Sequence, residues 1–168
     1  AQYLQRAKPR SKLLILDGNP DIVSKKGLFL KAWSELYPGL IEYRPNSALL
    51  EFDARARVAK LETEDVQADL FNIIPPQRAG RIAQPLVTVN NRWVGVEFLG
   101  FESTKVPGVH VIGDATASAP AMPKSGFMAN NHAKAVADAV IAHLTGQPLN
   151  DSPIITNTCY SFVSETEA

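Results

Sequence analysis

The stretch that decides the predicted fold is Val109-His110-Val111-Ile112-Gly113-Asp114-Ala115, followed after a short loop by Pro123-Lys124-Ser125-Gly126. A continuous apolar run that ends in a turn is typical of a buried strand in a parallel sheet. The residues from Ser125 to Leu144 predict a long helix, with Ser125 at its start and Gly146 just beyond its end. Strand, loop and helix in this order indicate an α/β fold.

The first half of the sequence also predicts a strand followed by a helix. Residues 12–18 predict a buried strand, and residues 25–37 predict a helix that Ser24 caps. Three short strands are expected at residues 40–44, 48–53 and 57–64, which gives a small antiparallel meander. Residues 66–74 predict another buried strand, and the prolines that follow it favour an extended exit from the domain. A short helix is expected around residues 78–84.

Composition excludes several classes of function. Lys+Arg and Asp+Glu number 17 each, so the net charge of zero gives no electrostatic basis for a nucleic-acid partner. No apolar run reaches the roughly 20 residues of a membrane span. The single cysteine, Cys159, excludes a disulfide within the chain, and the spacing of the three histidines indicates no metal site. The start lacks an initiator Met and a targeting core, so we expect the chain to be part of a longer protein.

Gly113 and Asp114 are candidate ligand-binding residues because open α/β sheets bind ligands at the carboxyl ends of their strands. A carboxylate at that edge suits a sugar-like or ribityl hydroxyl. The unpaired N–H groups at the start of the following helix, with Lys124 beside them, would favour an anionic atom such as the pyrimidine edge of a reduced flavin. The simpler alternative is a strand–loop–helix crossover in which Ser125 is only a cap.

Three segments carry a resemblance to a known family. The Gly113-Asp114-Ala115 and Pro123-Lys124-Ser125-Gly126 segments resemble the second FAD motif of the pyridine nucleotide–disulfide oxidoreductase superfamily. Asn72-Ile73-Ile74-Pro75-Pro76-Gln77-Arg78-Ala79-Gly80 and Asn157-Thr158-Cys159-Tyr160-Ser161 resemble segments of flavocytochrome c sulfide dehydrogenases. The resemblance implies a partial FAD/NAD(P)-binding two-dinucleotide fold. Residues 1–76 would be the latter part of the central NAD-like domain, residues 77–147 the closing part of the FAD-binding domain, and residues 148–168 the start of a C-terminal domain.

The resemblance also implies roles for individual residues. FAD would be bound by Gly113, Asp114, Ala115, Pro123, Lys124, Ser125 and Gly126, with Asp114 on the ribityl chain and Lys124 at the pyrimidine edge. Cys159 would be one half of a redox disulfide that sulfide attacks, and electrons would pass through FAD to a cytochrome c subunit in the periplasm. The Gly-rich pyrophosphate turn and the second cysteine of this family are missing from the sequence, so we expect the chain alone to be inactive.

Alternatives remain open at this point. A sulfide:quinone or NADH:quinone reductase carries the same FAD motif, and a non-catalytic nucleotide-binding or interaction module would need no flavin. Cys159 could be a small buried residue or an incidental thiol. His132 lies on the apolar side of its helix, which favours a core or interface histidine. Trp33 and Trp93 are interpreted as packing residues.

Overall fold

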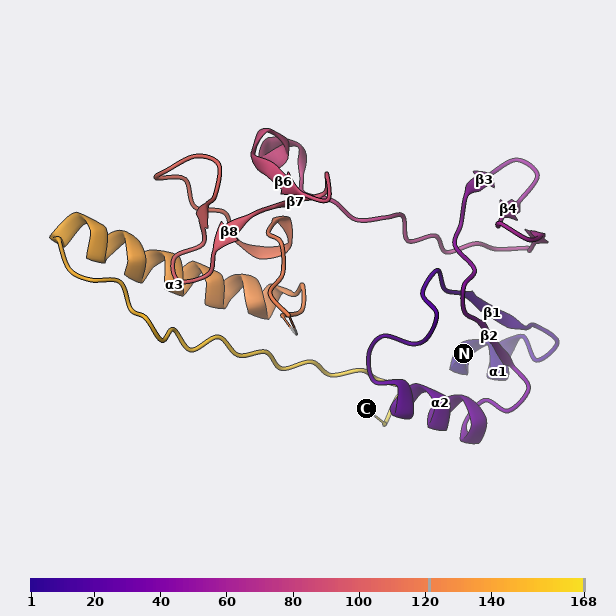
Figure 1. Ribbon diagram of the computed structural model, residues 1–168. Coiled ribbons are helices and arrows are strands. Elements are labelled where there is room, and N and C mark those ends of the chain that lie inside the picture. Colours follow the sequence, from indigo (N-terminus) through magenta and orange to yellow (C-terminus); the bar gives the residue numbers. More distant parts are fainter. Residues whose placement is uncertain (121, 168) are drawn as a thin grey trace. The chain divides into compact units, whose positions relative to one another are not determined.

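The computed structural model describes residues 1–120 and 122–167, which form two compact units (Figure 1). Unit 1 comprises Ala1–Ile73 together with the residues from Tyr160 onward, and unit 2 comprises Ile74–Cys159. Ala121, in the predicted loop before the long helix, and Ala168 lie outside the described residues. Both units mix helices with small sheets, so the structure is α/β in composition.

Unit 1 is built on a β–α–β arrangement. After the short helix α1 (Gln2–Ala7), strand β1 (Leu13–Leu16) leads into helix α2 (Lys26–Glu35), and strand β2 (Ile41–Arg44) returns parallel to β1. The predicted strand, helix and strand are therefore confirmed. The predicted Ser24 cap is wrong: the N-cap is Lys25, whose φ of 52° turns the chain into the helix without a side-chain hydrogen bond.

An antiparallel meander is present in unit 1, but not with the strands predicted for it, because residues 40–44 pair in parallel with β1 as strand β2. It consists of β3 (Glu51–Asp53), β4 (Val58–Lys60) and β5 (Asp65–Gln67), and its core contains Ala59, Leu61 and Val66. The buried strand predicted for residues 66–74 is wrong beyond Gln67. Because β4 is only three residues long, it pairs with no more than the three residues of β5, and Leu70 and Ile74 are 86% and 79% exposed.

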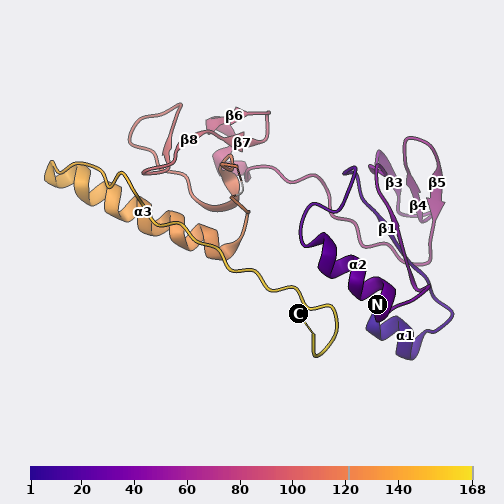
Figure 2. The same cartoon turned by 60° about the horizontal axis from the view of Figure 1, so that its bottom comes forward.

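Unit 2 contains two small hairpins and one long helix. The 3₁₀ helix η1 (Arg81–Leu86) replaces the α-helix predicted nearby and contains Pro85. Strands β6 (Val87–Val89) and β7 (Trp93–Val94) form one antiparallel pair, and β8 (Val96–Glu97) and β9 (Glu102–Ser103) form the other. The 3₁₀ turn η2 (Gly113–Ala115) and helix α3 (Gly126–Thr145) follow, and α3 lies along the hairpins (Figure 2).

The strand predicted at residues 109–114 is wrong as a sheet element. This segment makes one isolated antiparallel bridge, between Glu102 and His110, and then turns into η2. Backbone N–H groups of Ser103 and Val111 bond across to Val109 and Phe101. The segment is therefore extended, but in the described residues it meets only the two-residue β9 and no parallel neighbour.

Helix α3 packs on the core of unit 2 through one face. Val94 and Phe101 in that core are both 0% exposed. The buried residues of α3 recur every three or four positions: Met128, His132, Ala135, Ala139 and Ala142. Two apolar side chains of α3 lie away from this face: Ile141 is 61% exposed and Leu144 is 78% exposed. The backbone at Gly100 approaches α3 closely at Ala139. A Cβ added to Gly100 would lie only 2.9 Å from the Cβ of Ala139.

Residues 147–162 contain no helix or strand. The end of the chain joins the rest of unit 1 through polar contacts, among them a hydrogen bond of 2.9 Å from the Glu165 N–H to the Gln2 side-chain oxygen. Arg6 forms an ion pair with Glu165 at 3.0 Å, and the Tyr37 hydroxyl donates to the Val163 carbonyl at 2.5 Å. The three-domain division at residues 76 and 147 stays a prediction.

Candidate functional site

The turn at η2 requires glycine at Gly113 for two reasons. Gly113 has φ of +69°, in the region that side chains disfavour, and an added Cβ would lie 3.2 Å from the Cβ of Ala129 on α3. The Thr116 hydroxyl donates to the Gly113 carbonyl at 2.9 Å, and Thr116 is 1% exposed. The turn is therefore held tightly against the start of α3, while Asp114 within it is exposed.

Lys124 lies against the same turn. Its ammonium donates to the carbonyls of Asp114 at 2.9 Å and Thr116 at 2.5 Å, and it lies 3.8 Å from the centre of the Trp93 ring. Desolvation lowers the pKa of Lys124, whereas the negative charge of Asp114 acts in the opposite direction. The structure thus brings Lys124 to the predicted turn. The contact with Trp93 was missed, because no local pattern links a residue of a short strand to one that is 31 positions away.

Ser125 begins α3 as predicted. Its hydroxyl oxygen accepts a hydrogen bond from the Met128 N–H at 3.0 Å and donates one to the Asn157 side-chain oxygen at 2.8 Å. Gly126 follows with open space where a Cβ would lie, and exposed Pro123 precedes Lys124. The first turn of α3 carries no acidic side chain. Because Ser125 already accepts from the Met128 N–H, the N–H groups of Gly126 and Phe127 are the ones that an anionic group would meet.

The segment before Cys159 is tied to the first turns of α3. Besides the Ser125–Asn157 bond, the Asn131 side chain donates to the Thr156 carbonyl at 2.9 Å. Cys159 follows two residues after Asn157 and is exposed. The structure therefore brings the helix start and the segment of Cys159 into one unit. Sequence reasoning did not identify Asn131 or Asn157 as anchors, and their amide side chains were the available signal.

His132 is a buried polar side chain next to the η2 turn. It is 2% exposed and stacks on Phe101 with ring centres 4.0 Å apart. Its Nδ1 accepts a hydrogen bond from the Gly113 N–H at 3.0 Å, which links α3 directly to the η2 turn. Burial lowers the pKa of His132, and the nearby charge of Lys124 lowers it further. The prediction of a core histidine is confirmed.

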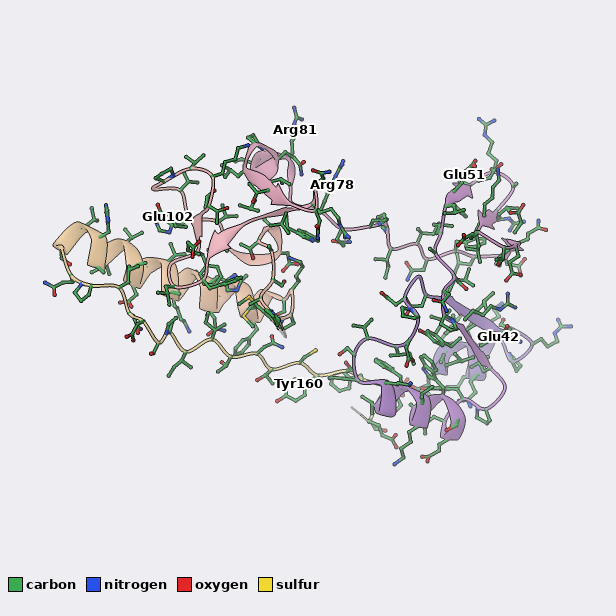
Figure 3. All side chains as sticks on the ribbon, in the orientation of Figure 1. Glu42, Glu51, Arg78, Arg81, Glu102 and Tyr160 are labelled. Atoms are coloured by element: carbon green, nitrogen blue, oxygen red, sulfur yellow. The ribbon has the colours of Figure 1, made fainter. Side chains whose placement is uncertain are left out.

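Two arginines of unit 2 lie on its surface. Arg78 and Arg81 are exposed and project from unit 2 (Figure 3). Within the described residues, no group of three or more His, Cys, Asp and Glu side chains is arranged to bind a metal ion. The helices in the described ranges are too short or too polar to cross a membrane.

Two comparisons with known proteins match different parts of the chain. The chain is similar to a chain in the cryo-EM structure of the Tetrahymena thermophila mitochondrial ATP synthase F1Fo composite tetramer, with a TM-score of 0.64 and 21% identity. The match covers 89% of this chain and 38% of that chain, and at this identity it shows a shared fold alone. Residues 1–75 match the family model of the central part of the flavoprotein chain of sulfide dehydrogenase (flavocytochrome c). The first part of the chain is therefore similar to a subunit of a flavin-dependent redox enzyme.

Proposed function

We propose that this chain is part of the flavin-binding subunit of a flavocytochrome c sulfide dehydrogenase. The parent protein would have the two-dinucleotide fold, oxidise sulfide through a redox disulfide and FAD, and pass electrons to a cytochrome c subunit in the periplasm. The family-model match over residues 1–75 supports the subunit. In unit 2, the proposal depends on the Ser125–Asn157 hydrogen bond of 2.8 Å. This bond links the segment of Cys159 to the start of α3, which suits a flavin.

The residues at the start of α3 fit a flavin with a ribityl side chain. The exposed Asp114 carboxylate is an acceptor for a ribityl hydroxyl, and charged acceptors make stronger hydrogen bonds than neutral ones. Gly126 has open space where a Cβ would lie, so the backbone at the start of α3 stays accessible to the flavin ring. The N–H groups that follow Ser125 suit the pyrimidine edge, where negative charge develops on reduction. Lys124 adds its charge while it holds the carbonyls of the turn.

Cys159 would act as one half of the redox disulfide, paired with a cysteine of the parent protein outside this sequence. Hydrosulfide attacks one sulfur of the disulfide, a new S–S bond forms as the old one breaks, and the products are a persulfide and a cysteine thiolate. FAD, when bound, supplies the two-electron acceptor that can pass electrons on singly. The anchors Asn131 and Asn157 would hold the segment of Cys159 at the flavin, and the start of α3 would favour the negative charge that develops there.

The decisive test uses the full-length protein that contains this chain. We expect Cys159→Ser to keep FAD bound but to abolish the reduction of the flavin by sulfide, because a hydroxyl can neither form the disulfide nor leave as a stabilised thiolate. Stopped-flow absorbance of the flavin after mixing with sulfide measures this step. Dithionite should still reduce the flavin in the variant, since it bypasses the cysteines.

The matched control is Thr158→Ser, which changes the neighbouring exposed residue and leaves the thiol intact. Flavin bleaching at the native rate in Cys159→Ser would overturn the role of Cys159. A full-length protein without flavin absorbance would overturn the proposed function as a whole and favour a non-catalytic module. Assays with cytochrome c and with a quinone as the acceptor separate the proposed enzyme from a quinone reductase.

A further inference from the structure

His132 is a buried titratable side chain to which the proposed reaction gives no role. Its ring is held on one side by the stack on Phe101, with ring centres 4.0 Å apart and planes inclined by 23°. Its Nδ1 bonds to the Gly113 N–H at 3.0 Å. Its Nε2 is buried and has no hydrogen-bond partner in the described part of the chain.

The Gly113 contact determines the protonation of the ring. A backbone N–H can only donate, so Nδ1 must be without a proton, and the neutral ring carries its proton on Nε2. That Nε2–H is buried without an acceptor, which is destabilising. An apolar side chain would avoid this cost but could not accept from Gly113. The hydrogen bond to Gly113 is therefore what distinguishes histidine from an apolar residue at this position.

The carbonyl groups of the turn accept hydrogen bonds from other side chains. Lys124 donates to the carbonyls of Asp114 and Thr116, and the Thr116 hydroxyl donates to the Gly113 carbonyl. His132 takes up the Gly113 N–H. With its backbone held in this way, the turn keeps the Asp114 carboxylate exposed rather than folded back onto these groups.

We infer that His132 is a positioning residue that fixes the Gly113–Ala115 turn in its flavin-binding conformation, and that it does so only while its imidazole is neutral. The inference rests on the proposed function for the flavin and on the structure alone for the turn. Protonation would place an N–H on Nδ1 opposite the Gly113 N–H, and the turn would lose its link to α3. The conformation of the turn, and with it the retention of flavin, becomes dependent on pH.

The charged groups that act on His132 are Lys124, which precedes α3, and Asp114, in η2; Phe101 contributes no charge. Desolvation lowers the pKa of His132 from its ordinary value of 6.5, Lys124 lowers it further, and Asp114 raises it. Because the pKa is lower in the folded than in the unfolded protein, the stabilisation by the neutral ring is complete above pH 6.5 and declines as the pH falls below that value.

The variants His132→Asn and His132→Leu form a matched pair for the test. Asparagine places an oxygen near the position of Nδ1 and does not titrate, whereas leucine has a similar size and no acceptor. Both lose the stack on Phe101, so their difference isolates the hydrogen bond to Gly113. The first measurement is the rate of FAD dissociation from the flavin-loaded full-length protein between about pH 5 and about pH 8.

We expect the native protein to release FAD faster as the pH falls. His132→Leu should release FAD about five-fold faster than the native protein near pH 8, with no dependence on pH, and the two rates should converge as the pH falls. His132→Asn should release FAD slowly at every pH. If the His132 ring served only for packing, both variants would release FAD at the same rate. The rate for the native protein would then not depend on pH. Equal release by both variants, or a native profile without pH dependence, would overturn the inference.

The second measurement needs no flavin and uses the 168-residue chain itself. The ¹⁵N shifts of the His132 ring report which nitrogen carries the proton, and hydrogen exchange of the Gly113 amide reports the bond. We expect a protonated Nε2 at neutral pH and a Gly113 amide that loses protection as His132 is titrated. If the chain shows this behaviour but the full-length protein binds no flavin, the proposed function fails. The role of His132 in holding the Gly113–Ala115 turn then still stands. If the hydrogen exchange of the Gly113 amide does not change as His132 is titrated, His132 does not hold the turn. This outcome can be read even if His132→Leu does not fold.

Discussion

Asp114 is the side chain that the proposed flavin site exposes most directly. It lies in the η2 turn, and its carboxylate is on the surface while the backbone around it is held by Lys124 and Thr116. In the full-length protein we expect Asp114→Ala to weaken FAD binding by about ten- to a hundred-fold, because a charged hydrogen bond contributes roughly 1.5–3 kcal/mol. Fluorescence titration of the apoprotein with FAD measures the change.

The control for Asp114 is Asp138→Ala, which removes an exposed carboxylate of α3 in the same unit. Circular dichroism should be unchanged in both variants, since neither side chain is part of the core. If Asp114→Ala binds FAD as tightly as the native protein, Asp114 does not bind the ribityl chain.

At the scale of elements, the close approach of Gly100 to α3 is a constraint that can be tested without a ligand. The Cβ of an alanine at position 100 would lie 2.9 Å from the Cβ of Ala139, closer than side chains approach one another. We expect Gly100→Ala to lower the free energy of unfolding by about 1–3 kcal/mol, because α3 or the β8–β9 hairpin must shift. Urea denaturation measures this difference.

A compensating change makes the prediction for Gly100 specific. The double variant Gly100→Ala with Ala139→Gly removes the clash, so it should recover part of the lost stability, offset by the lower helix propensity of glycine. The control Gly27→Ala lies in α2, where an added Cβ meets nothing within 4 Å, and should stabilise the chain slightly. The packing interpretation fails if the double variant is no more stable than the sum of its single changes predicts.

At the scale of the molecule, exposed apolar side chains predict that the chain associates with itself. One helix, α3, exposes Phe127, Ile141 and Leu144 at 50%, 61% and 78%. Exposed apolar side chains of this kind favour association. We expect sedimentation velocity to show reversible oligomers whose population rises with the concentration of the chain.

The variant Ile141→Lys should shift that equilibrium towards the monomer, because it places a charge on the exposed face of α3. The control is Lys134→Ala, which alters an exposed charged position of the same helix. A native chain that stays monomeric over the whole concentration range would show that this face does not associate.

The sequence by itself determined the features that depend on near neighbours. Ser125 and Gly146 bound α3 because the N-cap and the left-handed C-cap satisfy backbone groups within four residues. The order strand–helix–strand in unit 1 followed from apolar runs and periodicity. The Gly113-Asp114 turn was identifiable too, because a glycine next to a carboxylate marks a place where the backbone can turn and a ligand can approach.

The tertiary structure decided which partners those residues meet. His132 bonds to Gly113 across 19 positions, and Ser125 to Asn157 across 32, so no local pattern could predict either pair. It also decided which face of α3 is buried, because several faces of an alanine-rich helix are apolar enough and the close contact with Gly100 selects one of them. The strand predicted at residues 109–114 failed for the same reason: a strand is completed by hydrogen bonds to a neighbour, and the neighbour is a property of the fold rather than of the segment.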